Sequence, residues 1–153
     1  MKNSLLGVSL LLCLGLAMTG CGDDGGCPEG QVSCDGVCID AIDRTLTSIQ
    51  AEIFTPTCAF SSCHDSEFPA SELDLSSVSA SEQNLIGVPS VEIPTRLRVE
   101  RGDARRSYLA NKVTGDEMAP GTAQMPLNDQ GLELCQPRLD AIIEWIDDGA
   151  PIN

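Results

Sequence analysis

The sequence has few aromatic residues, few basic residues and a single histidine. Its 153 residues include one Trp, one Tyr, three Phe and nine Lys or Arg, against 23 Asp or Glu, and the net charge is −14. We expect no nucleic-acid binding, because the phosphates of nucleic acids require a basic surface. A hydrolase is disfavoured as well, since no second histidine is present to serve a Ser or Cys nucleophile.

Long apolar runs are also absent, except at the N-terminus. Lys2 precedes an apolar stretch from Leu5 to Ala17, whose thirteen residues are too few to span a bilayer. Small residues then lead to Cys21, and the whole pattern resembles a bacterial lipoprotein signal. We expect residues 1–20 to be removed, Cys21 to be acylated and residues 21–26 to form a flexible tether. The alternative is ordinary secretion, with Cys21 free or in a disulfide.

The lipid would hold an exported protein on a membrane, in the periplasm or at the outer surface. Removal of residues 1–20 takes away one lysine and no acid, so the net charge changes from −14 to −15. An acidic surface steers a basic partner in a salt-dependent way, or it only keeps an exported protein dispersed.

Eight cysteines in a chain of this length indicate an oxidising compartment. Residues 27–41 contain Cys27, Cys34 and Cys38 among turn residues, including Asp35-Gly36, with too few apolar side chains to form a core. We therefore expect disulfides to hold this segment. A zinc site is the functional alternative.

Helical spacing of apolar residues marks three segments of the domain expected over residues 42–153. The first covers roughly residues 43–54 and should end at Pro56, and the second follows Asp103, which can cap a helix over residues 104–112. The third begins near Pro137, stops near Gly149, and has an apolar face formed by Leu139, Ile142, Ile143 and Ile146. We see no strand pattern. The sequence thus predicts a small, mostly α fold with long loops, in which a large bound group supplies part of the core.

The residues from Cys58 to His64 form the most informative motif. Cys58 and Cys63 are followed at once by His64, the arrangement that attaches c-type haem through two thiols and an imidazole. Four residues separate the cysteines instead of the usual two, so the extra residues must bulge outward. The alternative is that Cys58 and Cys63 form a disulfide, together or with Cys135, and that His64 is a surface residue.

The stretch from Ile53 to Ala150, about two thirds of the chain, resembles the cytochrome c-like domain of the planctomycete and myxobacterial type. Besides the motif, the resemblance is carried by Ile53-Phe54, Leu73-Asp74-Leu75, Gly102-Asp103, Ser107-Tyr108-Leu109, Met125-Pro126-Leu127 and Trp145-Ile146. It implies a helical fold whose first and last helices cross, with one covalent haem c in a loop-lined crevice. It further implies His64 and Met125 as axial ligands of the iron. Met118 is the other methionine available, and Met125 as core filler is the bland alternative.

An iron with both axial positions filled implies an electron carrier that works with redox partner proteins, and not an enzyme. Two rival functions remain open. One is a haem sensor or peroxidase with an open sixth position, and the other is a haem-free, disulfide-stapled envelope lipoprotein that binds a partner. Six Lys or Arg residues between Arg96 and Lys112 either neutralise haem propionates or form a solvated face.

If haem takes Cys58 and Cys63, four cysteines are left for two disulfides, with three possible connectivities. These are Cys27, Cys34, Cys38 and Cys135. Because Cys135 lies far along the chain, we expect one bridge to join the Cys-rich segment to the start of the last helix.

Overall fold

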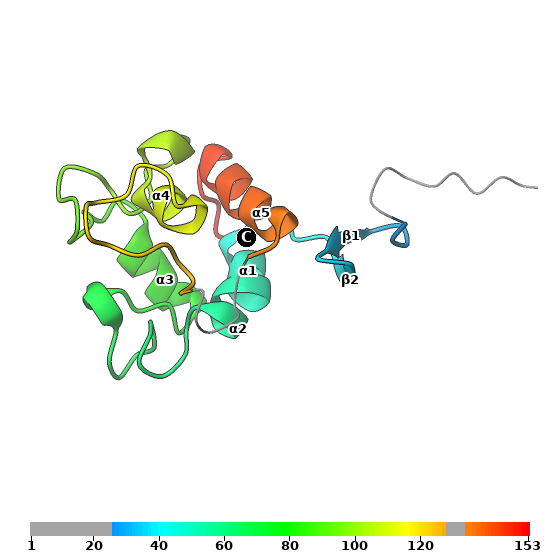
Figure 1. Ribbon diagram of the computed structural model, residues 1–153, viewed down its shortest axis with the longest axis horizontal. Helices are drawn as coiled ribbons and strands as arrows, with labels where there is room; N and C mark the ends of the chain where they lie inside the picture. The colour runs from blue at the N-terminus through cyan, green and yellow to red at the C-terminus, as the bar shows by residue number, and fades with distance from the viewer. Residues whose placement is uncertain (1–25, 128–133) are drawn as a thin grey trace, which may run out of the picture.

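The computed structural model describes residues 26–127 and 134–153. The expected signal (residues 1–20), Cys21 and all of the expected tether but Gly26 lie outside these residues. The helices gather in one body, and a small hairpin projects from one side of it (Figure 1). No helix in the two described ranges has the length and apolar character needed to cross a membrane.

A β-hairpin forms in the Cys-rich segment, so the expectation of no strands is wrong there. β1 (Gln31–Cys34) and β2 (Val37–Asp40) pair antiparallel. Asp35 and Gly36 connect them with φ angles of 50° and 85°, the left-handed conformations of a tight two-residue turn. Sequence periodicity missed these strands because each has only four residues.

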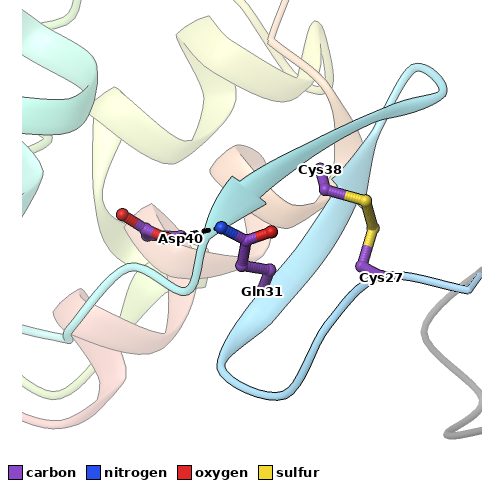
Figure 2. The surroundings of a disulfide bond; sticks show 4 residues. All are labelled: Cys27, Gln31, Cys38 and Asp40. Carbon is purple, nitrogen blue, oxygen red and sulfur yellow. Dashed lines mark hydrogen bonds between the residues drawn. A yellow bond between two sulfur atoms is a disulfide. The ribbon is translucent and has the colours of Figure 1, made fainter.

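Side-chain links stabilise this hairpin, because a two-stranded sheet alone is marginal in water. A disulfide joins Cys27 to Cys38, and the amide of Gln31 donates a hydrogen bond of 2.9 Å to the carboxylate of Asp40 (Figure 2). The expectation that disulfides hold this segment is confirmed, and the zinc alternative does not hold.

The second disulfide joins Cys34, at the end of β1, to Cys135, which immediately precedes α5 (Gln136–Asp147). Two disulfides among these four cysteines, with one bridge to the start of the last helix, were expected and are confirmed. The connectivity itself was left open by the sequence and is Cys27–Cys38 with Cys34–Cys135.

The first helical segment is continuous but irregular. It consists of α1 (Leu46–Ile49), a π-helical stretch η1 (Gln50–Phe54) and α2 (Thr55–Thr57), and the side chain of Thr45 caps it. Pro56 therefore does not end the helix, contrary to expectation. It lies in the first turn of α2, where its missing N–H is tolerated after the wider π turn.

Two further helices occupy the middle of the chain. α3 (Val78–Leu85) begins after Ser77, whose hydroxyl accepts a bond from the helix, and was not predicted because its sequence is polar. The expected helix over residues 104–112 is a 3₁₀ turn, η3 (Ala104–Arg106), followed by α4 (Tyr108–Thr114). Asp103 caps the turn, as predicted.

The last helix, α5, matches the prediction at both ends. Pro137 lies in its first turn, and the chain leaves it at Gly149, whose φ is +93°. Figure 1 shows α5 beside α1, and their apolar faces share one core. Its most buried large side chains are Leu46, Ile49, Ile53, Phe54, Leu85, Ile142, Trp145 and Ile146. The small helical fold agrees in outline with the prediction, and the hairpin makes its content mixed.

The C-terminal residues complete the start of α1. The first N–H groups of a helix have no partner inside it. Here Leu46 donates to the carbonyl of Pro151 (2.9 Å) and Thr47 to that of Ile152 (3.1 Å). The indole of Trp145 also donates to the carbonyl of Pro151, at 3.0 Å. The two ends of the helical body are therefore joined by backbone bonds.

Candidate cofactor site

A hollow opens between the helices and the irregular middle segments. It holds about 740 Å³ of empty space, counting the part open to solvent. Most of its lining is apolar and comes from η1, α3, α4 and α5 and from the irregular segments between the helices. These apolar residues include Phe54, Leu73, Leu75, Leu85, Leu109, Val113 and Ile142.

Three of the four predicted cofactor-binding residues line this hollow together. They are Cys58, His64 and Met125, which lie on segments that are distant in the sequence. Cys63 is half-buried but is not among the lining residues, and neither is Met118. Both Cys58 and Cys63 have unbonded sulfurs, so the disulfide alternative for this pair does not hold.

The residues between the two cysteines form an outward turn. The N–H of Cys63 donates to the carbonyl of Phe60 (2.9 Å), and Ser62 adopts a left-handed φ of 73°. Phe60 and Ser62 are exposed, while the N–H of His64 donates back to the carbonyl of Cys58 at 3.2 Å. The turn therefore brings the second cysteine and the histidine back to the first cysteine, as the wider spacing requires.

The imidazole of His64 has a defined tautomer. Its Nδ1 lies 3.0 Å from the carbonyl oxygen of Leu73. A carbonyl oxygen only accepts, so Nδ1 carries the hydrogen and Nε2 keeps its lone pair. Burial lowers the pKa of His64, against the opposing effect of the bond to Leu73. The ring is therefore neutral at pH 7, which is the form that binds metal ions.

Met125 is held by the end of α4. Its N–H donates to the carbonyl of Lys112 (2.7 Å), and the side chain of Gln124 donates to the carbonyl of Val113 (2.9 Å). Earlier in the same loop, the N–H of Ala119 donates to the hydroxyl of Tyr108 at 3.1 Å. Hydrogen bonds to one helix thus fix the loop before and at the methionine.

Charged side chains also line the hollow. The carboxylate of Glu92 accepts from the hydroxyl of Tyr108 (2.6 Å) and forms an ion pair with Lys112 (3.2 Å). Arg98 lines another part of the wall, and burial lowers its pKa. Arg98 and Lys112 belong to the basic stretch noted in the sequence, whereas Glu92 had no signal that singled it out.

The other arginines of that stretch bind elsewhere. Arg96 pairs with Glu117 (2.9 Å) and Arg106 with Glu100 (3.2 Å). These two arginines therefore agree with the prediction of a solvated face, and the prediction of propionate neighbours stays open for Arg98 and Lys112. Among the described residues, the basic side chains that line the hollow are Arg98 and Lys112, and Lys112 is paired there with Glu92.

The donor set fits a c-type haem. Two unbonded thiols precede a neutral imidazole in the sequence, and the first thiol, the imidazole and a thioether line one mainly apolar wall. Burial raises the pKa of the Cys58 thiol, so it stays protonated at neutral pH and is not an ionised nucleophile. In the described part of the chain, no three or more His, Cys, Asp or Glu side chains are grouped to hold a metal ion by themselves.

Comparisons with protein-family models, with curated proteins and with solved structures found no match to this chain.

Proposed function

We propose that this chain is a monohaem c-type cytochrome, an electron carrier anchored by lipid outside the cytoplasm. One observation carries the proposal. Cys58, His64 and Met125, from distant parts of the sequence, line one mainly apolar hollow. A thiol, an imidazole and a thioether that converge from separate segments are the groups that would bind one haem. The resemblance of residues 53–150 to a cytochrome c-like domain supports haem as the group that this wall would bind.

The residues divide the binding of one haem c between them. Cys58 and Cys63 would supply the two thioether bonds, while His64 and Met125 would ligate the iron. When bound, such a haem exchanges single electrons at an iron that has no open position, so the protein is a carrier and not an enzyme.

The remaining wall residues would orient the ligands and exclude water. Leu73 holds His64 in the tautomer whose Nε2 is free, and Lys112 holds the backbone of Met125. The apolar lining would exclude water from the buried face of the haem, which strengthens electrostatic interactions there. Arg98 and Lys112 would balance the propionate charge of the haem.

The net charge and the N-terminal sequence support a proposal for the partners and the location of the protein. With a net charge of −14, the protein would meet redox partners that present a basic surface, and their association would weaken with added salt. Acylation of Cys21 would tether it to a membrane in the periplasm or at the outer surface. Nucleic acid is not expected as a partner.

A haem stain on a denaturing gel tests the function directly. The full chain, expressed with a cytochrome maturation system, is expected to stain at its own mass, because only covalently bound haem survives denaturation. A colourless protein would overturn the proposal and support a haem-free, disulfide-stapled lipoprotein. A stained protein whose unmodified iron is high-spin and binds carbon monoxide would instead support an open-site sensor or peroxidase.

Met125→Ala tests the sixth ligand. The variant is expected to lose the spectroscopic signature of sulfur ligation completely and to have a lower reduction potential, because thioether sulfur favours reduced iron. Met118→Ala is the matched control, since Met118 is also half-buried in the same loop but does not line the hollow. Loss of the signature in Met118→Ala, or its retention in Met125→Ala, would show the axial assignment to be wrong.

A further inference from the structure

Arg98 is a buried arginine whose guanidinium binds backbone carbonyls. The residue is 7% exposed and lines the hollow. Its Nη1 donates to the carbonyls of Glu72 (3.2 Å) and Asn84 (2.9 Å), and its Nη2 donates to that of Ser71 (2.8 Å). Arginine presents several donors in one rigid plane, so it can hold all three carbonyls at once.

The backbone of Arg98 is itself fixed on both sides. Its N–H donates to the carbonyl of Val88 (2.7 Å), and its carbonyl accepts from Leu109 of α4 (2.9 Å). The side chain therefore extends from a fixed backbone. It reaches the end of α3 and the loop that follows the motif from Cys58 to His64.

The loop has an unfavourable backbone conformation at the two residues whose carbonyls Arg98 binds. Ser71 and Glu72 are consecutive non-glycine residues with φ angles of 54° and 55°. Residues with a Cβ rarely adopt this left-handed backbone conformation, so the surrounding structure must hold Ser71 and Glu72 in it. The next residue is Leu73, whose carbonyl accepts the hydrogen bond from Nδ1 of His64 at 3.0 Å.

We infer that Arg98 is a positioning residue for His64. By holding the carbonyls of Ser71 and Glu72, its guanidinium keeps the left-handed turn that presents the Leu73 carbonyl to Nδ1. This turn sets the tautomer and orientation of the ring. The inference rests on the proposed function only in making His64 an iron ligand, since the chain of contacts does not involve the haem.

Arg101 provides a matched control within the same chain. Its Nη1 also donates to two backbone carbonyls, those of Gly149 and Ala150, both at 2.7 Å. It does not line the hollow. Arg101→Lys and Arg98→Lys therefore remove the same kind of clamp and keep the charge, but only the second acts on the loop beside His64.

The measurement is exchange of the His64 Nδ1 proton with solvent, followed by NMR. The signal is unambiguous because the chain has one histidine. In Arg98→Lys, protection from exchange is expected to fall about tenfold, the factor that corresponds to the loss of ~1.4 kcal/mol. Arg101→Lys should leave this protection unchanged. Unchanged protection in Arg98→Lys, or an equal fall in both variants, would overturn the inference.

A second substitution tests whether Arg98 acts on His64 through the left-handed turn at Ser71 and Glu72. Glycine adopts left-handed φ values without strain, so adding Ser71→Gly to Arg98→Lys should restore part of the protection. No restoration would mean that Arg98 does not act through the turn. If Arg98→Lys does not fold, the inference is tested by proton exchange in the wild-type protein at increasing denaturant concentration. The guanidinium protons of Arg98 and the Nδ1 proton should then share one denaturant dependence of exchange, and different dependences would refute the inference.

Failure of the two proposals can be told apart. The exchange measurement works on the full chain with reduced, diamagnetic haem, and equally on the full chain if it proves to carry none. A negative haem stain with intact protection of the Nδ1 proton would remove the cytochrome proposal and leave the role of Arg98 standing. A positive stain without the expected fall in protection would do the reverse.

Discussion

Replacing Cys58 and Cys63 together by serine is expected to abolish covalent haem binding. A hydroxyl oxygen does not form the thioether bonds that attach c-type haem, and the described residues offer no other unbonded cysteine. The haem stain on a denaturing gel should fall to background, and intact mass should equal that of the polypeptide alone. Each single variant should keep one attachment and retain stain.

The control for this experiment removes a different pair of cysteines. Cys27→Ser with Cys38→Ser eliminates the hairpin disulfide, which lies in the segment before the helices. This variant should retain full stain. Stain in the Cys58 and Cys63 double variant, or its loss in the control alone, would contradict the assignment of the attachment sites.

Replacing Cys34 and Cys135 together by alanine is expected to lower the free energy of unfolding by about 4–5 kcal/mol. The two residues are 101 positions apart, and in the chain-entropy account a bond across such a long loop strongly restricts the unfolded chain. Small domains have total stabilities of roughly 5–15 kcal/mol, so this variant should lose between about a third and nearly all of its stability.

The hairpin disulfide provides the comparison for that prediction. Cys27 and Cys38 are only 11 positions apart, and their replacement by alanine should cost about 3 kcal/mol on the same account. Both variants are compared with wild type by chemical denaturation, in the same haem-loaded or haem-free form. A larger loss in the Cys27 and Cys38 variant would refute the expected order.

The sequence predicted those parts of the fold that depend on local rules. The apolar spacing in α5, the cap at Asp103 and the turn at Asp35 and Gly36 each involve neighbours along the chain, and each is present. Pro56 misled the prediction because a π turn before it changes the hydrogen-bond pattern. α3 was missed because Ser77 begins a helix that is polar on most of its surface.

For the candidate site, the sequence could not predict contacts between side chains and backbone groups that are far apart along the chain. Cys58 and His64 lie within seven residues of each other, so spacing alone singled them out as candidates. Arg98 reaches carbonyls that precede it by 14 to 27 positions, and Glu92 meets Tyr108 across 16. No spacing rule encodes such contacts, because the irregular backbone between the helices decides which side chains meet.

The bonds from Leu46 and Thr47 to the carbonyls of Pro151 and Ile152 make the start of α1 depend on residues that follow the last helix. The indole of Trp145 depends on the carbonyl of Pro151 in the same way. Truncation after Ala150 would therefore leave three donors without their partners, and each that stayed buried would cost about 1–3 kcal/mol.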